Sequence, residues 1–237
     1  MRLSCTYSME EVLPIDYRPG FMSLLKKGLE ESNPALYTQL YENMTTKPFT
    51  FSIYFRGGLV IDKSEGTIRG NYPEISLDIS SSSCELMTFI YNGLLRIPEY
   101  LMYSANLRMK EIRFIDSVKI NNDYVIFKTL SPVLIKTREK KRDEYILPDR
   151  SEFKERLNYY VNLTWREITK TENEFEVNFI SLPGKISKEV VFHMGVPFTA
   201  FRGVFVLQGE PEILQFIYDV GLGIRRNQGF GMLEVVK

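Results

Sequence analysis

Four glycines and two adjacent arginines stand close together near the C-terminus, in the segment 221–232, which reads GLGIRRNQGFGM. Glycine tolerates positive φ angles and close backbone approach, and successive exposed N–H groups in such turns bind anions. The arginine guanidinium groups add planar donors that suit phosphate. The segment follows a helix-like run and precedes a strand-like run, which is not the order of a Rossmann loop or a P-loop. Two interpretations stay open: a phosphate-binding loop whose arginines point outward, or a structural turn.

A second group of residues suited to phosphate is a basic segment in which five of seven positions are positive: Lys136, Arg138, Lys140, Lys141 and Arg142. Such a segment could neutralise several phosphates of a nucleic acid. Aromatic and basic residues also adjoin at Tyr54-Phe55-Arg56, and bases of single-stranded RNA stack on such rings. The competing interpretations are a solvated loop and ordinary core aromatics.

His193 is the only histidine in the chain. Histidine pairs are therefore excluded, as is any Ser-His-Asp triad not built on this residue. It lies in an apolar, strand-like run, so we expect a histidine that a neighbour satisfies or that is exposed on one face. The two cysteines, Cys5 and Cys84, lie far apart among apolar neighbours and are expected to be reduced core thiols. No spacing of carboxylates indicates a metal site.

Bulk composition places the chain among globular proteins, with 44% hydrophobic and 25% charged residues. Thirty Lys and Arg balance thirty Asp and Glu, so any RNA binding must come from local clusters of positive charge. No run approaches the roughly 20 apolar residues of a membrane helix, and the N-terminus lacks an apolar signal run. We therefore expect a cytoplasmic protein without a membrane segment.

The first half of the chain has the periodicities of a ferredoxin-like unit. Alternating apolar residues predict strands near 3–9, 49–55, 75–79 and 101–114, and glycines at 57, 58 and 66 indicate a hairpin between two of them. Helical spacing predicts helices over 21–29, after an Asn33-Pro34 cap, and over 86–94 after Ser81 to Ser83. The resulting order is β-α-β-β-α-β.

The second half again alternates predicted strands with two helices. Strands are predicted over 124–136 with a break at Ser131-Pro132, over 175–179, 190–194 and 198–207, and after the glycine-rich segment. Helices are predicted over 153–168 and 211–220. We expect an α+β fold of two tandem ferredoxin-like (RRM-like) domains, 1–118 and 119–237, with antiparallel sheets and helices packed on them.

Several motifs occur in a recognisable order along the whole chain. The most specific is G-x-G-x(5)-G-x-G at 221–231, and the weaker ones are Ser32-Asn33-Pro34, Lys47-Pro48-Phe49-Thr50-Phe51-Ser52, Asn92-Gly93-Leu94-Leu95 and Leu130-Ser131-Pro132-Val133. In these motifs the chain resembles the CRISPR-associated endoribonucleases that process repeat RNA, members of the repeat-associated RAMP superfamily.

The resemblance implies a reaction and a set of partners. The ribose 2′-hydroxyl attacks the adjacent phosphate without a metal ion or cofactor, and leaves a 2′,3′-cyclic phosphate and a 5′-hydroxyl. The implied partner is CRISPR repeat RNA, with subunits of a CRISPR effector complex as a further class, and the implied state is a monomer or homodimer.

The chain departs from this family where many members carry a general-base histidine, because that position is Tyr41. The family's lysine is matched by Lys47, and its first-helix position by Lys26 or Lys27. A tyrosine with a pKa of about 10 is a poor base at pH 7 unless nearby lysines lower that pKa or stabilise the phosphorane charge themselves. The candidate catalytic residues are therefore Tyr41, Lys47 and Lys26.

Three functions remain open from the sequence. The first is a repeat-RNA endoribonuclease, the second a catalytically silent subunit that binds repeat RNA, and the third a general single-strand RNA-binding module. The candidate RNA-binding residues are Lys27, Arg56, Lys136, Arg138, Lys140, Lys141, Arg142, Gly221, Gly223, Arg225, Arg226, Asn227, Gln228, Gly229 and Gly231.

Overall fold

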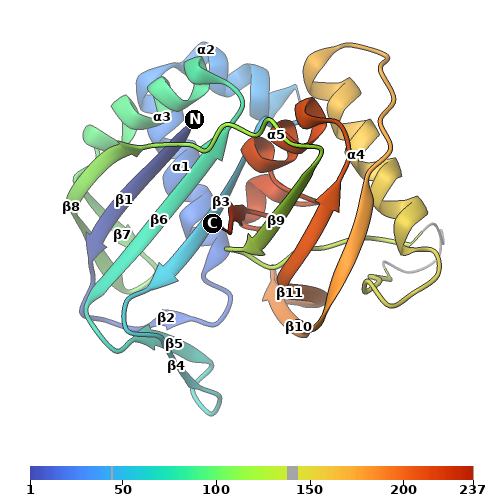
Figure 1. Ribbon diagram of the computed structural model, residues 1–237. Coiled ribbons are helices and arrows are strands. Elements are labelled where there is room, and N and C mark those ends of the chain that lie inside the picture. Colours follow the sequence, from blue (N-terminus) through green and yellow to red (C-terminus); the bar gives the residue numbers. More distant parts are fainter. Residues whose placement is uncertain (44, 138–143, 237) are drawn as a thin grey trace.

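The computed structural model describes residues 1–43, 45–137 and 144–236. Its N-terminal half forms a five-stranded antiparallel sheet in the order β3-β6-β1-β8-β7, with helices on one face (Figure 1). The elements of this half are β1 (Arg2–Ser8), α1 (Arg18–Ser32), α2 (Pro34–Tyr37), the π-helical turn η1 (Thr38–Glu42), β3 (Phe49–Phe55), β6 (Glu74–Ser81), α3 (Cys84–Leu95), β7 (Glu99–Met102) and β8 (Ala105–Ile115). Without the short β7, this is the predicted β-α-β-β-α-β unit.

The first strand buries every second residue, as its alternating sequence predicts. Leu3, Cys5 and Tyr7 are fully buried. They lie opposite Ile79, Leu77 and Ile75 of β6, so one face of the sheet joins the core beneath the helices. A small sheet in the order β2-β5-β4 extends from one end of this half, built from β2 (Leu13–Pro14), β4 (Leu59–Asp62) and β5 (Thr67–Gly70). The glycine-bounded hairpin is therefore present, although β2 was not predicted.

Helices α1 and α3 touch at a pair of glycines. A Cβ atom built on Gly93 would lie 1.7 Å from the carbonyl oxygen of Gly28. No side chain fits at that separation, so the Asn92-Gly93-Leu94-Leu95 motif sets how closely the two helices pack. The predicted caps are also present: Asn33 accepts a hydrogen bond from Leu36 N (3.0 Å), and Ser83 accepts one from Leu86 N (3.1 Å).

The C-terminal half forms a second antiparallel sheet in the order β10-β11-β9-β12. Its elements are β9 (Tyr124–Thr129), α4 (Phe153–Thr169), β10 (Asn178–His193), β11 (Val196–Gln208), α5 (Pro211–Val220), the 3₁₀ turn η2 (Arg226–Gln228) and β12 (Leu233–Val235). Counted within each half, and without β7, the strands of the two main sheets share the order 2-3-1-4, which is the ferredoxin-like arrangement in both. The first sheet ends at Ile115 and the second begins at Tyr124, so the division at 118/119 falls in the connection and stays a proposal.

Some boundaries differ from those predicted. The runs 175–179 and 190–194 overlap the two ends of one long strand, β10, which begins only at Asn178, ends at His193 and changes register between Ser181 and Ile186. The strand predicted over 101–114 is two strands, because the chain turns at Tyr103 with φ 56°. Cys5 is buried as expected, but Cys84 is the exposed first residue of α3, so the core-thiol prediction was wrong for it.

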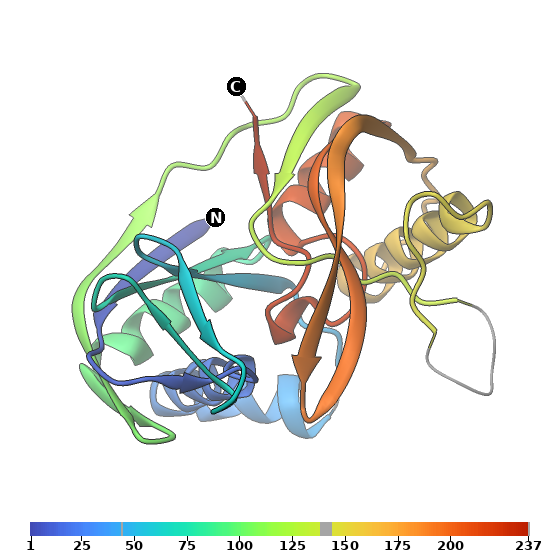
Figure 2. The same cartoon turned by 90° about the horizontal axis from the view of Figure 1, so that it is seen from below.

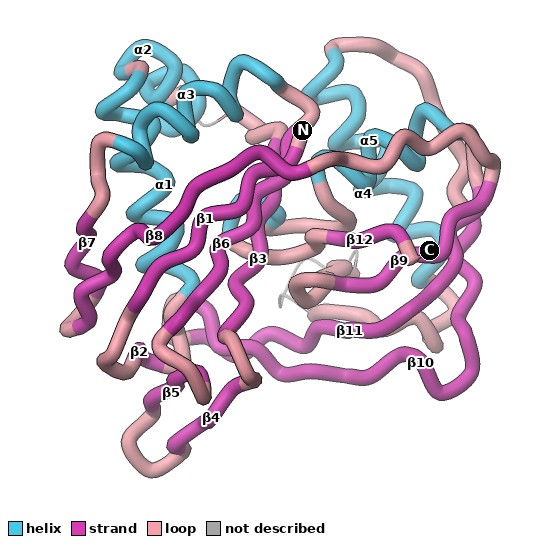
Figure 3. The backbone as a smooth tube through the Cα atoms, turned by 60° about the vertical axis from the view of Figure 1, so that its left-hand side comes forward, coloured by secondary structure: helices cyan, strands magenta, loops and turns pink. Residues whose placement is uncertain are grey.

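The two halves are joined by buried polar contacts as well as apolar ones. Arg2 of β1 donates to the carbonyl oxygens of Tyr218 (3.0 Å) and Leu233 (2.5 Å), and its guanidinium lies 3.7 Å from the Tyr218 ring centroid. Burial lowers the pKa of this arginine. The tip of the β10–β11 hairpin also reaches the first half, where Gly195 N donates to Asp16 (2.9 Å; Figures 2 and 3).

Candidate active site

Lys26, Tyr41 and Lys47 come together although they lie on three different segments. Lys26 is on α1, Tyr41 is on η1, and Lys47 precedes β3. The ammonium nitrogens of Lys26 and Lys47 lie 4.9 and 4.8 Å from the centroid of the Tyr41 ring. Both distances are within the range of cation–π attraction. The structure thus assembles the three predicted catalytic residues around one aromatic ring, which we call the lysine–tyrosine cluster.

The local backbone explains this convergence. Pro34 opens α2, which continues into the wider π-helical turn of η1, and this places Tyr41 against Tyr37 with ring centroids 5.3 Å apart. Thr45 Oγ1 donates to the carbonyl oxygen of Gln39 (3.1 Å), and Lys47 Nζ donates to that of Thr45 (3.0 Å). The chain is therefore folded back so that Lys47 returns to the turn carrying Tyr41.

The pKa shifts in the cluster favour the lysines over the tyrosine as groups that transfer a proton. Burial, followed by the neighbouring Tyr37, raises the pKa of Tyr41. Of the two roles open to the nearby lysines, lowering that pKa is contradicted, because loss of solvation dominates for this phenol, and stabilisation of the phosphorane charge stays a prediction. Burial and the nearby Lys26 ammonium lower the pKa of Lys47. An ammonium group with a lowered pKa releases its proton more readily than an ordinary lysine.

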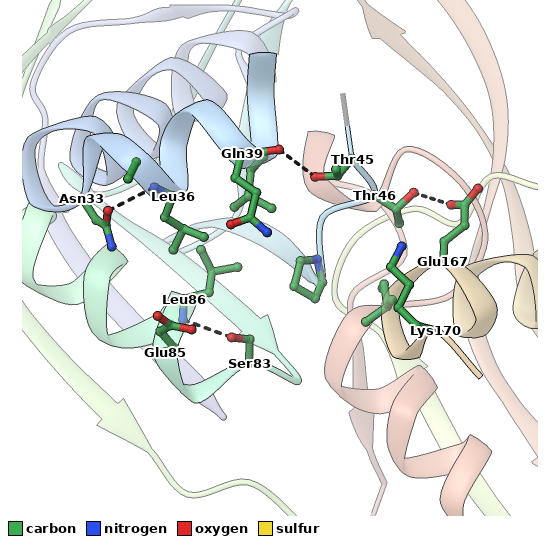
Figure 4. Close-up of a pocket in the computed structure, with 14 residues that line it drawn as sticks. Asn33, Leu36, Gln39, Thr45, Thr46, Ser83, Glu85, Leu86, Glu167 and Lys170 are labelled. Atoms are coloured by element: carbon green, nitrogen blue, oxygen red, sulfur yellow. Dashed lines mark hydrogen bonds between the residues drawn. The ribbon is translucent and has the colours of Figure 1, made fainter. Parts of the chain in front are cut away.

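A pocket of about 420 Å³ adjoins the segment that carries Lys47. Figure 4 shows Asn33, Leu36 and Gln39 along one side, with Thr46, Glu167 and Lys170 on the opposite side. Glu167 comes from the last turn of α4, so the pocket lies between the two halves of the chain. Its lining mixes apolar side chains with amide, hydroxyl and charged groups, as small-ligand pockets do.

The glycine-rich loop, residues 221–232, is packed between the halves. Its four glycines all have positive φ. A Cβ on Gly223 would lie 2.3 Å from Leu134 O, and one on Gly231 would lie 2.1 Å from Leu222 O. At Gly229 a Cβ would meet the Phe51 ring of the first half at 2.8 Å. Close contacts within the protein therefore explain why these positions need glycine, which supports the structural interpretation of the loop.

The two arginines of this loop have different surroundings. Arg226 is buried and donates to Val220 O (3.4 Å), and burial lowers its pKa to about 10. The expectation that both arginines point outward is thus wrong for Arg226, since its guanidinium is enclosed by protein. Arg225 is half-buried, lies 4.7 Å from the Phe198 ring centroid and donates to Gln228 (2.9 Å). Asn227 and Gln228 are also half-buried.

His193 is part of the support of this loop. It is fully buried, its Nε2 lies 2.9 Å from Gln228 Oε1, and its Nδ1 lies 3.9 Å from Asp16 Oδ1. A neighbour therefore satisfies one ring nitrogen, as one of the sequence interpretations expected. The ring occupies the junction of the β10–β11 hairpin, the glycine-rich loop and the start of α1.

The remaining predicted RNA-binding residues that the structure describes do not gather at one place. Lys27 is exposed on α1 with its ammonium 5.9 Å from the Tyr100 ring centroid, and exposed Arg56 forms an ion pair with Glu74. Lys136 forms an isolated β-bridge with Tyr145. Four positions of the basic segment lie outside the described residues: Arg138, Lys140, Lys141 and Arg142.

Sequence reasoning missed the residues that join the glycine-rich loop to α1. Arg18 is buried at the start of α1, where its Nε donates to Gly229 O (3.3 Å) and its guanidinium lies 5.1 Å from the Phe230 ring centroid. Thr50 of β3 donates to Phe230 O (2.8 Å). An arginine directly before Pro19 at a helix start gave no signal for this role, since its partners are backbone atoms more than 200 residues away.

Two further findings concern only the described part of the chain. No group of three or more His, Cys, Asp or Glu side chains is placed there to hold a metal ion. Among the helices of these residues, none is long and apolar enough to cross a membrane.

Comparison with known proteins identifies relatives over the full length. Residues 115–235, about half of the chain, match the family model for CRISPR associated protein Cas6, C-terminal. The chain is 27% identical over 227 residues to the CRISPR-associated endoribonuclease Cas6 of Pyrococcus furiosus, covering 94% of this chain and 83% of that protein.

Solved structures agree on the fold. A structure described as a Cas6-related gene product from Pyrococcus furiosus aligns with a TM-score of 0.89 at 24% identity, covering 100% of this chain and 98% of that one. A second, described as a RAMP protein that binds different RNA substrates, aligns with a TM-score of 0.86 at 22% identity over 100% of both chains. The predicted α+β fold with two ferredoxin-like units is confirmed.

Proposed function

The chain belongs to the Cas6 family of CRISPR-associated proteins, and from this premise we propose that it is an endoribonuclease that cuts CRISPR repeat RNA without a metal ion. The observation that carries the proposal is the lysine–tyrosine cluster. Lys26 and Lys47 hold their ammonium groups within 5 Å of one ring centroid at a partly exposed position. Two positive charges held close together suit the negative charge that develops on a phosphorane.

The proposed reaction assigns each proton. The ribose 2′-oxygen attacks phosphorus and loses its proton to water, while the bond from phosphorus to the 5′-oxygen breaks. Lys26 stabilises the phosphorane charge, and the Lys47 ammonium donates a proton to the leaving 5′-oxygen, as its lowered pKa favours. The products are a 2′,3′-cyclic phosphate and a 5′-hydroxyl. Tyr41 positions the two ammonium groups, because its raised pKa makes it a poor base.

In this proposal the glycine-rich loop binds RNA through its half-buried side chains. Arg225, Asn227 and Gln228 supply polar groups there, and the loop rests on Arg18 at the start of α1. Lys26 lies eight residues further along the same helix, which is about 12 Å at 1.5 Å per residue. RNA held by the loop can therefore follow α1 toward the lysine–tyrosine cluster.

The second candidate function is a silent subunit that binds repeat RNA. The raised pKa of Tyr41 favours it, because this residue occupies the position of the histidine base in the family pattern.

Purified protein incubated with repeat RNA in EDTA separates the two functions. The proposal expects one discrete cut, with a 2′,3′-cyclic phosphate end, and no cut in a scrambled RNA of the same length. Tight binding of repeat RNA without any cleavage would establish the silent subunit instead. Equal binding of repeat and scrambled RNA without cleavage would contradict both and indicate a general single-strand binder.

A further inference from the structure

The last turn of α4 reaches across to the segment that carries Lys47. Thr46 donates a side-chain hydrogen bond to Glu167, which lies 121 residues away in the C-terminal half (Figure 4). Thr46 and Glu167 also line the same pocket. The residue directly before Lys47 is therefore attached to the second sheet's helix, which no sequence motif indicated.

Residues 45–47 are held by two bonds to other elements and by one bond within the segment. Thr45 is bonded back to the π-helical turn, Thr46 to α4, and Lys47 Nζ to the carbonyl oxygen of Thr45. In this short connection between η1 and β3, the position of the Lys47 ammonium depends on the backbone of its two neighbours. The bond to Glu167 fixes the middle of the segment from outside the N-terminal half.

Glu167 itself is placed by a well-anchored part of α4. The Trp165 ring is buried against Phe175 and Phe216, with ring centroids 4.8 and 4.9 Å apart, and its Nε1 donates to Thr171 (2.8 Å) just beyond the helix end. The carboxylate of Glu167 also acts on the glycine-rich loop, because its charge raises the pKa of the buried Arg226 against the effect of burial. Glu167 thus bonds to the segment that carries Lys47 and also interacts electrostatically with the buried arginine of the loop.

We propose that Glu167 is a positioning residue for Lys47, and that it couples the C-terminal half to the reactive lysine through Thr46. This inference rests on the proposed function for its catalytic consequence. An exposed hydrogen bond contributes little to stability, so the effect on unfolding is small. The effect on rate is larger, because a displacement of about 1 Å at a reacting group can slow a reaction about 100-fold.

Single-turnover cleavage of repeat RNA tests the inference. Glu167→Ala and Thr46→Val should each slow cleavage about 10-fold or more, with unchanged affinity for a repeat RNA that carries a 2′-deoxyribose at the cut site. Glu167→Gln keeps an oxygen acceptor for Thr46 and should stay within about 3-fold of the wild type. The double variant Glu167→Ala with Thr46→Val should be no slower than either single variant, since both remove the same bond. Glu174→Ala, which removes an exposed carboxylate partner of Arg166, is the matched control and should leave the rate unchanged.

Backbone order parameters of the free protein, from NMR relaxation, decide the structural claim independently of cleavage. Glu167→Ala should lower the order parameters selectively in residues 45–47, whereas Glu174→Ala should not. Lowered order parameters with no cleavage even in the wild type would support the coupling and remove the endoribonuclease proposal. Unchanged order parameters, or a wild-type cleavage rate in Glu167→Ala, would overturn the assignment of Glu167.

Discussion

The glycine-rich loop and the lysine–tyrosine cluster differ in what surrounds their characteristic residues. The glycines at 221, 223, 229 and 231 face backbone or buried side chains, and Arg226 is enclosed. The side chains of Lys26, Tyr41 and Lys47 remain partly exposed, and two cations share one ring. The most recognisable motif of the sequence therefore supports the structure, while the proposed chemistry is assigned to the less conspicuous residues.

Replacing a crowded glycine should have the largest effect. Gly231→Val would drive a side chain into Leu222 O, which a Cβ would approach to 2.1 Å, so we expect a loss of about 4 kcal/mol or more in unfolding free energy. Gly184→Ala is the control, because Gly184 also has positive φ but has nothing within 4 Å of a Cβ. That variant should lose only about 1 to 2 kcal/mol. Similar losses in both, measured by denaturant unfolding, would remove the structural interpretation of the loop.

Alanine variants of the two loop arginines should separate an effect on stability from an effect on RNA binding. Arg226→Ala leaves Val220 O without its donor in a buried site and should cost about 2 kcal/mol of stability. Arg225→Ala should change stability by less than about 0.5 kcal/mol. If Arg225 contacts a phosphate, its loss should also lower the slope of log affinity against log salt by about 0.7. Normal RNA affinity and slope in Arg225→Ala would exclude this side chain from the RNA interface.

Substitutions at Tyr41 test whether its ring or its hydroxyl matters. Tyr41→Phe keeps the ring between the lysines and should cut repeat RNA within about 3-fold of the wild-type rate, because the phenol is not the base. Tyr41→Ala removes the ring and should slow cleavage about 10-fold through misplacement of the ammonium groups. A 100-fold loss in Tyr41→Phe, with RNA affinity intact, would instead make the hydroxyl a proton-transfer group.

The smallest expected effect is on the pH dependence of stability, and it comes from His193. Burial lowers the pKa of His193 below its ordinary value of 6.5, so the unfolded chain binds its proton more readily than the folded protein. The stability associated with the neutral ring is therefore present above about pH 6.5 and is lost as pH falls through the folded pKa. Desolvation raises the pKa values of the half-buried Asp78 and Asp219, which act in the opposite direction, so the comparison must be between variants. His193→Asn should flatten the decline of stability between pH 7 and 5 and leave cleavage at pH 8 within about 3-fold of the wild type. A variant that declines as steeply as the wild type would contradict this account.

Local patterns predicted the elements well, and long-range contacts explain what they missed. The alternation of Leu3, Cys5 and Tyr7 and the Asn33-Pro34 cap are determined by neighbours in sequence, so strand and helix follow directly. The merging of two predicted strands into β10 depends on pairing with β11, which no local period encodes. The three catalytic candidates came from a resemblance, and their convergence was a property of the fold.

The contacts that distinguish the two sites could not be predicted from local sequence. Arg225 and Arg226 are adjacent and chemically identical, yet only the position of α5 and the loop's turns decides which one is buried. The raised pKa of Tyr41 likewise follows from burial, with a smaller contribution from the neighbouring Tyr37, and no local pattern encodes that burial.

The single-turnover rate of Lys47→Ala on repeat RNA in EDTA tests the central claim most directly. Lys63→Ala is the control, since Lys63 is an exposed lysine directly after β4 and belongs to none of the candidate sites. If the lysine–tyrosine cluster is the reacting site, Lys47→Ala should cut about 100-fold more slowly while its melting temperature and RNA affinity stay those of the wild type. Lys63→Ala should cut within about 3-fold of the wild-type rate. Wild-type cleavage by Lys47→Ala would contradict the account and place the chemistry elsewhere.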